Sequence, residues 1–326
     1  MVSSGECLEF SKIDLELNPF IPLVALSTGH TQTVLGHIVP SKSANLNLTE
    51  VILKLADGDE LLLEYCDNKS DHTISIYHGL AGDSQADYIQ RSAQLAEQLG
   101  WNIVLVNHRG ANSKARATKT YHSGRGEDAD AVLKWAKDKF RNSRQIALGF
   151  SMSGSILLNL LTRRYGAIQP DFAIVVNSPL DLARCSLLLT QGFSKIYDYR
   201  FYFILKNLIQ QKNEISMPII GRTMDIDQLY TSKANGFADA ADYYTKCSTL
   251  NYVGRIETRT FVLAAHDDPF IDIADYLRAG WNKYVHLTYE KHGGHMGYFA
   301  KKKDPRYGHR WLDHYLESVF KKISAL

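Results

Sequence analysis

Short apolar runs alternate along this chain with segments whose apolar residues recur at the spacing of a helix. Residues 50–55 and 60–65 alternate between apolar and polar positions, which predicts two antiparallel strands joined by a turn at residues 57–59. Further strands are predicted at residues 73–77, 102–106, 145–148, 172–176, 259–264 and 284–289. Helices are predicted at residues 86–99, 127–140, 154–164 and about 305–320, with Lys301, Lys302 and Lys303 as a solvated helix start.

The order of these elements predicts the fold class. Repeated strand–helix units build a mostly parallel, twisted sheet with helices on both faces, so we expect an α/β fold. Residues 180–251 interrupt the alternation with helical and loop-like sequence, which predicts a helical cap inserted after the sixth strand. The cap should cover the carboxyl edge of the sheet, where open α/β sheets bind ligands. We expect residues 46–179 and 252–326 to form the core, and residues 1–45 an N-terminal extension packed on it.

The composition narrows the class of protein. The 326 residues are 45% apolar and 22% charged, which is typical of a soluble globular chain and excludes a disordered, collagen-like or coiled-coil one. The 37 basic and 35 acidic residues leave a net charge of +2 without a basic stripe, so we expect no nucleic-acid partner. The oligomeric state stays open.

Targeting signals and cysteines bear on the compartment. The N-terminal residues lack the basic and apolar regions of a secretory signal, and no apolar run approaches the ~20 residues that span a bilayer. The four cysteines are scattered and form no C-x-x-C pair, which favours free thiols: Cys7, Cys66, Cys185 and Cys247. We therefore expect a cytoplasmic protein without an integral membrane segment.

The most informative segment is residues 146–155, where a buried strand runs directly into an apolar helix. Ser151 stands at the junction, with Gly149 two residues before it and Ser153 two residues after it. A tight strand-to-helix turn holds its serine in a strained conformation and accepts only small neighbours at these positions. The helix N-terminus adds N–H groups and partial positive charge. Ser151 is therefore predicted to be a nucleophile rather than a plain helix cap.

A serine hydroxyl needs a histidine to take its proton and a carboxylate to orient that histidine. Two acids and then two histidines follow late strands, in the order this fold requires: Asp267, Asp268, His292 and His295. We favour Asp268 because it directly precedes the proline of its turn, and His295 because it follows a Gly-Gly pair. Asp267, and Asp181 after the preceding strand, stay open as alternative acids, and His292 is expected to bond structurally.

Serine attack creates an oxyanion that two preorganised N–H groups must hold. One donor should be the backbone N–H of Met152, which follows the nucleophile. The second should come from the loop after the third strand, where His78-Gly79-Leu80-Ala81-Gly82 stands, and we assign it to the Leu80 N–H. An ordinary glycine turn is the alternative interpretation of that loop.

Cofactor chemistry has no sequence support. The chain contains no G-x-x-x-x-G-K-[ST] phosphate loop, no dinucleotide G-x-G-x-x-G and no H-E-x-x-H zinc motif. His292 and His295 are close enough in sequence to suggest a metal pair, but no third ligand accompanies them at a useful spacing. We therefore expect neither a cofactor nor a metal.

Taken together, these segments resemble the α/β-hydrolase superfamily and, within it, the YheT-like branch that includes the embryogenesis-associated plant proteins. The resemblance runs from about residue 18 to the C-terminus and includes an N-terminal H-x-Q-T signature at residues 30–33. The other matching motifs are His78-Gly79-Leu80, Asn107 with Arg109-Gly110, Tyr121-His122-Ser123-Gly124, residues 149–154, Asp267-Asp268-Pro269-Phe270 and His292-Gly293-Gly294-His295. Ser153 departs from the glycine of many members.

The resemblance implies a serine hydrolase with Ser151 as nucleophile, Asp268 as acid and His295 as base, and members act on carboxylic esters and in some cases lipids. The function hypothesis is therefore a carboxylic-ester hydrolase that forms an acyl-enzyme without a cofactor. A non-catalytic binding protein of the same fold is one alternative, and a thioesterase or acyltransferase using the same triad is another.

Aromatic residues of the cap bear on the substrate. Residues 197–208 include Phe201 and Tyr202, which suggest an apolar pocket for the acyl or alcohol part of a small ester. The same residues could instead pack the cap onto the sheet, and the sequence does not separate the two interpretations.

Overall fold

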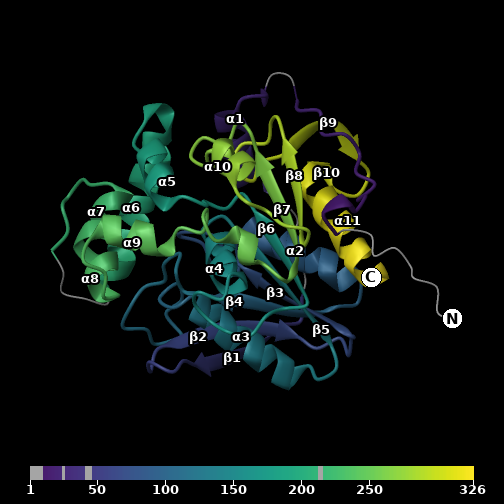
Figure 1. The fold of residues 1–326 in the computed structure, drawn as a ribbon, viewed down its shortest axis with the longest axis horizontal. Coiled ribbons are helices and arrows are strands. Elements are labelled where there is room, and N and C mark those ends of the chain that lie inside the picture. Colours follow the sequence, from purple (N-terminus) through teal and green to yellow (C-terminus); the bar gives the residue numbers. More distant parts are fainter. Residues whose placement is uncertain (1–9, 24–25, 41–45, 212–215) are drawn as a thin grey trace.

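Eight strands form one sheet in the order β1-β2-β4-β3-β5-β6-β7-β8 (Figure 1). The computed structural model describes residues 10–23, 26–40, 46–211 and 216–326. The strands are β1 (Thr49–Lys54), β2 (Glu60–Cys66), β3 (His72–Tyr77), β4 (Asn102–Asn107), β5 (Arg144–Phe150), β6 (Phe172–Val176), β7 (Arg259–Ala265) and β8 (Val285–Glu290). The predicted strands are therefore confirmed to within one or two residues at each end.

Strand direction follows the predicted pattern. β1 pairs antiparallel with β2, and β2 pairs antiparallel with β4, whereas every other pair in the sheet is parallel. The parallel strands β3, β4 and β6 are buried along their whole length, because helices cover both faces of the sheet. That double burial is the reason for the continuous apolar runs in the sequence.

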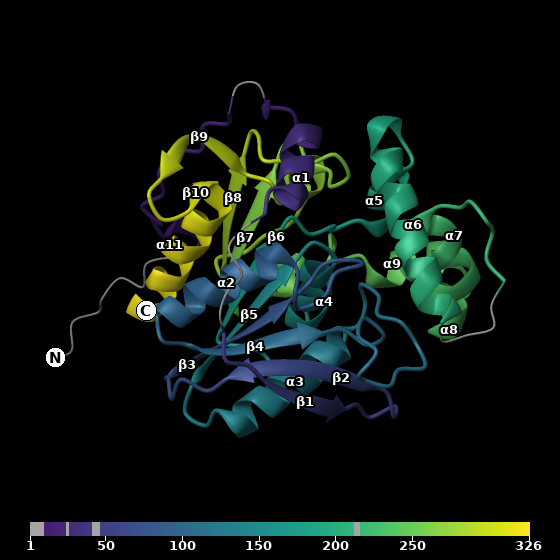
Figure 2. The same cartoon turned by 180° about the vertical axis from the view of Figure 1, so that it is seen from behind.

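Helices pack on both faces of the sheet (Figures 1 and 2). On one face, α2 (Asp87–Gln98) and α11 (Trp311–Ala325) share a core with every second residue of the central strands, such as Ile103 and Leu105 of β4. On the other face, α3 (Gly126–Lys139) and α4 (Met152–Leu161) pack against the alternate residues. Farther along that second face lies α10 (Ile273–Arg278), whose Tyr276 is fully buried. The expected α/β sheet with two helical layers is confirmed.

The chain between β6 and β7 consists of helices and loops in the part that the structure describes, and no strand occurs there, as predicted. Its elements are α5 (Leu182–Leu189), η3 (Gly192–Ser194), α6 (Lys195–Gln210), α7 (Thr223–Ile226), η4 (Asp227–Thr231), α8 (Ser232–Ala234), α9 (Ala240–Cys247) and η5 (Val253–Arg255). Figure 1 shows α5 to α9 grouped to one side of the sheet. The boundaries at 180 and 251 stay a prediction.

The helix predicted near residues 305–320 is present as α11 (Trp311–Ala325), but the prediction for the lysines before it was wrong. Lys301, Lys302 and Lys303 do not start a helix: they lie in β9 (Phe299–Asp304), which pairs with β10 (Gly308–Arg310), and α11 begins only at Trp311. The lysines are exposed, but the Lys301 N–H donates to the Ile21 carbonyl oxygen and Ala300 bridges to Pro22. Partners distant in sequence therefore impose an extended backbone that local helix propensity does not predict.

The N-terminal segment packs on the core where it is described. A short turn, η1 (Phe10–Lys12), places Phe10 in the same cluster as α2 and α11, and α1 (Gly29–Ile38) follows. Residues 1–9, with Cys7, lie outside the described residues, as do 24–25, 41–45 and 212–215. The thiols of Cys66, Cys185 and Cys247 are free. No helix in the described part of the chain is long and apolar enough to cross a membrane.

Candidate active site

Ser151 occupies a sharp turn between β5 and α4. Its backbone has φ 52° and ψ −123°. Residues other than glycine adopt such a positive φ only when the surrounding structure imposes it. Gly149 is required there because a Cβ on it would lie 2.7 Å from the Ser153 carbonyl oxygen. Ser151 is partly exposed, unlike the buried residues around it, so its hydroxyl is held at the surface of a cavity.

Ser153, which stands where the resembled family commonly has glycine, bonds locally. Its hydroxyl donates to the His78 carbonyl oxygen and lies 2.7 Å from Nε2 of His108. Burial holds the pKa of the His108 imidazole well below its usual range, so this ring is neutral at physiological pH. The Ser153 side chain therefore connects the turn to the loops after β3 and β4. Ser151 keeps its positive φ beside it.

His295 joins the serine to a carboxylate. Its Nε2 lies 2.9 Å from the Ser151 Oγ, and its Nδ1 lies 2.8 Å from the Asp268 Oδ2. Only 3% of His295 is exposed, and the ring of Phe270 covers it with a centroid separation of 4.1 Å. The imidazole is thus buried between the serine hydroxyl and the Asp268 carboxyl group.

Asp268 is surrounded by hydrogen-bond donors. The backbone N–H groups of Phe270 and Ile271 both donate to its Oδ1 at 3.1 Å. Its Oδ2 accepts from the Asn177 Nδ2 at 2.9 Å and faces the Nδ1 of His295. Contacts on both oxygens therefore fix the orientation of the Asp268 carboxyl group toward His295.

Asn177 is a site residue that the sequence analysis missed. It lies directly after β6, and its Nδ2 bridges Asp268 and the Gly294 carbonyl oxygen, while the Tyr298 hydroxyl donates to its Oδ1 at 2.9 Å. The asparagine therefore connects the turn of the acid with the loop of the histidine. Its position at the carboxyl end of a buried strand was the available signal.

The alternative acids lie elsewhere. Asp267 accepts from the Gly294 N–H at 2.8 Å and faces His292 at 3.4 Å, rather than His295. Asp181 caps α5 by accepting from the Arg184 N–H. Of the three carboxylates considered, Asp268 is therefore the one in hydrogen-bond contact with His295, and His292 faces Asp267 rather than Ser151.

The loop after β3 lies against the serine. A Cβ on Gly79 would be 3.2 Å from the Ser151 Cβ, so the two segments touch. The Gly79 N–H donates to the Tyr88 hydroxyl and the Ala81 N–H to the Tyr121 hydroxyl. Among the described residues, no acceptor binds the N–H of Leu80 between them, nor that of Met152. Both residues line the same cavity as Ser151.

The helix α1 holds the loop that carries His295. The His295 N–H donates to the Thr33 hydroxyl at 2.8 Å, and that hydroxyl donates in turn to the Gly29 carbonyl oxygen. Gln32 accepts from the Phe299 N–H through its Oε1 and donates back to the Phe299 carbonyl oxygen. The sequence analysis noted residues 30–33 only as a family signature. Their contacts make Gln32 and Thr33 positioning residues for the histidine.

The chain is similar to known proteins over most of its length. The family described as the alpha/beta hydrolase fold matches residues 73–176. A relative in Escherichia coli K12, named "Putative esterase YheT", is 30% identical over 297 residues, which cover 86% of this chain and 87% of the relative. The chain belongs to the α/β-hydrolase family.

More distant members of the family are also similar to this α/β hydrolase. The mouse protein named "Phospholipase ABHD3" is 27% identical over 301 residues, covering 86% of this chain and 73% of the relative. The Pyrococcus furiosus esterase Pf2001 superposes with a TM-score of 0.62 at 17% identity, covering 86% of this chain and 91% of that structure. The superposition supports the fold that the sequence predicted.

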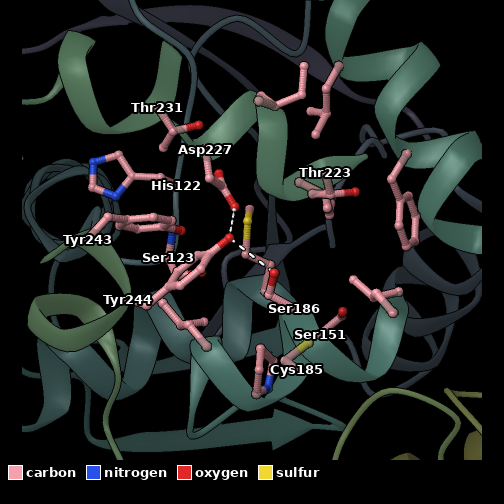
Figure 3. A pocket seen from close by; sticks show the side chains of 18 of the residues that line it. His122, Ser123, Ser151, Cys185, Ser186, Thr223, Asp227, Thr231, Tyr243 and Tyr244 are labelled. Carbon is pink, nitrogen blue, oxygen red and sulfur yellow. Dashed lines mark hydrogen bonds between the residues drawn. The ribbon is translucent and has the colours of Figure 1, made fainter. Parts of the chain in front are cut away.

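A cavity between the sheet and the cap opens at Ser151 in this α/β hydrolase (Figure 3). Phe201 of α6 lines it together with apolar side chains of α5 and the β7–α10 turn, such as Leu189 and Ile271. Tyr202, the next residue, is fully buried in a separate cluster and donates to the Pro218 carbonyl oxygen. The interpretation of Phe201 as a pocket residue is confirmed, whereas Tyr202 packs the cap internally.

Proposed function

We propose that this protein is a serine hydrolase of carboxylic esters that uses Ser151, His295 and Asp268 and no cofactor. One observation carries the proposal: a strained serine at a strand–helix turn lies 2.9 Å from an imidazole whose other nitrogen lies 2.8 Å from a buried carboxylate. That arrangement is what activation of a serine hydroxyl requires. Membership of a family whose relatives are named as esterase and phospholipase supports the reaction class.

In the first half of the reaction, Nε2 of His295 takes the proton as Ser151 Oγ forms a bond to the ester carbonyl carbon. The N–H groups of Leu80 and Met152 hold the oxyanion, which preorganised backbone donors stabilise without reorganising. The tetrahedral intermediate then collapses, and the protonated His295 gives its proton to the departing alcohol. Asp268 stays ionised throughout and stabilises the imidazolium form of His295.

In the second half, water replaces the alcohol. His295 takes a proton from the water as its oxygen attacks the acyl carbon, and the proton then passes to Ser151 Oγ as the carboxylic acid leaves. Each half returns His295 to its neutral form, and the second half restores the Ser151 hydroxyl. The free thiols fit a reducing, cytoplasmic setting, and the apolar pocket suits a small ester with an apolar acyl or alcohol part.

Labelling with a fluorophosphonate probe tests the proposal. We expect the wild-type protein to form one covalent adduct and Ser151→Ala to form none. Peptide mass spectrometry should place the adduct on Ser151 rather than on Ser123 or Ser186, which line the same pocket. As a control, Ser324→Ala replaces an exposed serine of α11 and should label like the wild type. An unlabelled wild-type protein, or an adduct that survives in Ser151→Ala, would overturn the mechanism and favour a binding protein.

A pair of neighbouring aromatic residues gives a test of the pocket. Phe201→Ala enlarges the cavity, so the preferred acyl chain should become longer by a few carbons, with stability little changed. Tyr202→Ala should leave the preferred length alone but lower the free energy of unfolding by about 3–5 kcal/mol, because it empties a buried site. Initial rates on a series of 4-nitrophenyl esters and a urea titration measure the two effects. Equal chain-length profiles for Phe201→Ala and wild type would contradict the assignment.

A further inference from the structure

The pocket wall formed by the cap contains a polar cluster that the proposed reaction does not use. The Tyr244 hydroxyl of α9 donates to Asp227 Oδ2 of η4 at 2.8 Å and lies 3.1 Å from the Ser186 hydroxyl of α5. Figure 3 shows these three side chains joined by hydrogen bonds in the pocket that also contains Ser151. Three cap segments distant in sequence therefore bring one carboxylate and two hydroxyls to a wall that is otherwise largely apolar.

In the part of the chain that the structure describes, Asp227 has no cationic partner. It is the one acidic side chain among the described residues that line the pocket, and no Lys or Arg lines it there. No salt bridge to Asp227 occurs within the described chain. Burial raises the pKa of its carboxyl group to about 6, although the hydrogen bonds from Tyr244 and Thr231 oppose that rise. Because this pKa lies below 7, the carboxylate form predominates at neutral pH.

The backbone at this acid is also unusual. Asp227 begins η4, a π-helical turn over residues 227–231 between the short helices α7 and α8. π-Helical turns are rare in proteins, and those that occur are often found at functional sites. The turn places the Asp227 and Thr231 side chains at the pocket together.

An ionised carboxylate in an apolar pocket gains most from a further hydrogen-bond donor. Desolvation penalises its charge, and the Tyr244 hydroxyl that bonds it is neutral and compensates the charge only in part. A carboxylate offers about four lone-pair sites, of which the Tyr244 hydroxyl uses one. The side chain is half-buried and lines the cavity, so a ligand group can reach the remaining sites.

We propose that Asp227, held in place by Tyr244 and Ser186, binds a hydrogen-bond donor on the part of the ester that enters the cap, either a hydroxyl or an ammonium group. The inference rests on the proposed ester hydrolysis and makes Asp227 its specificity-determining residue. The apolar wall binds the carbon chain, and Asp227 selects chains that end in a donor. A site built to bond a polar group rejects the analogue that lacks it, because its own polar atoms are then left unpaired.

Matched esters test the selection. One series varies the acyl group and the other varies the alcohol, and in each the chain ends in a methyl, a hydroxyl or an ammonium group with the same number of heavy atoms. At about pH 8 the Asp227 carboxyl is ionised. We expect kcat/KM in at least one series to favour a donor-ended chain by about tenfold over the methyl-ended one.

Two variants of Asp227 distinguish selection of a hydroxyl group from selection of an ammonium group. Asp227→Leu removes charge and acceptor together, so the preference for both donor-ended chains should be lost. Asp227→Asn keeps an acceptor but loses the charge, so a preference for ammonium should fall about tenfold while part of a preference for hydroxyl remains. Glu257→Gln, an exposed acid paired with Arg163 outside the pocket, controls for the change in net charge. A methyl-ended preference in the wild type, or a donor preference that survives in Asp227→Leu, would overturn the inference.

Direct binding separates this inference from the proposed function. Titration calorimetry of an alkanol, the matching alkanediol and the matching amino alcohol needs no turnover. The diol or the amino alcohol should bind the wild type about tenfold more tightly than the alkanol, and Asp227→Leu should bind all three alike. Hydrolysis of methyl-ended esters without any donor preference would refute the role of Asp227 but leave the proposed ester hydrolysis intact. Donor-selective binding without hydrolysis or labelling would refute the proposed function but leave the role of Asp227 in binding intact.

Discussion

Replacing Asp268 with asparagine should lower kcat for ester hydrolysis by about 10⁴-fold, the loss that follows when the acid of a Ser-His-Asp triad becomes an amide. The partners of Asp268 give the reason. Two backbone N–H groups donate to Oδ1, and Asn177 Nδ2 and the His295 ring face Oδ2. Whichever way the amide turns, its NH₂ group meets a donor, so His295 loses either its orientation or its correct tautomer.

The other two acids provide matched controls. Asp181→Asn leaves a good N-cap on α5, so kcat and stability should stay close to the wild-type values. Asp267→Asn weakens the bond to the Gly294 N–H and should cost about tenfold through the position of the histidine loop. Steady-state kinetics of the three variants, with thermal unfolding as a check on folding, measure the difference. A larger loss in Asp267→Asn or Asp181→Asn than in Asp268→Asn would reassign the acid.

Gly29→Ala should lower kcat by about 10²-fold, although Gly29 lies in the N-terminal segment far from Ser151 in sequence. A Cβ at this position would lie 1.6 Å from the Asp267 carbonyl oxygen, so α1 or the β7–α10 turn must shift. That turn carries Asp268, and the neighbouring Thr33 holds the His295 N–H. A displacement of about 1 Å among catalytic groups costs about 10²-fold in rate.

The direction of the change in stability shows whether the Gly29→Ala side chain clashes with the turn. Alanine normally stabilises a helix over glycine by about 0.5–1 kcal/mol, so a destabilised Gly29→Ala protein reports the clash. Gly280→Ala is the control, because a Cβ there has no neighbour within 4 Å and its backbone is not left-handed. Urea unfolding and ester kinetics on both variants give the comparison. Wild-type activity in Gly29→Ala would show that α1 does not position the histidine loop.

Local pattern accounts for most of the fold. A buried parallel strand is apolar throughout, and a helix covering it is apolar on one face, so each strand–helix unit can be recognised without its neighbours. β6 begins and ends as predicted, at Phe172 and Val176. The candidate nucleophile was recognisable for the same reason, because the small residues around Ser151 meet a steric demand of the turn itself.

Features that depend on contacts between residues far apart in sequence were harder to predict from the sequence. Lys301, Lys302 and Lys303 suit an exposed helix start, yet Ile21 and β10 hold them in a strand. Nothing near Gln32 or Thr33 in sequence indicates that they hold the His295 loop, since their partners lie more than 260 residues away. The cluster of Asp227, Tyr244 and Ser186 likewise joins residues 17 and 58 positions apart, which no local pattern brings together.

The choice among the three acids illustrates the division most clearly. Asp267 and Asp268 are adjacent, so position along the chain favours neither strongly, and the backbone of one extended turn points them in different directions. Strand and helix periodicity, and the small residues of a tight turn, are properties of neighbours in the chain and can be recognised from the amino-acid order. Which carboxylate meets the histidine depends on side-chain direction and on contacts across the fold, which form only when the packed sheet, α1 and the cap come together.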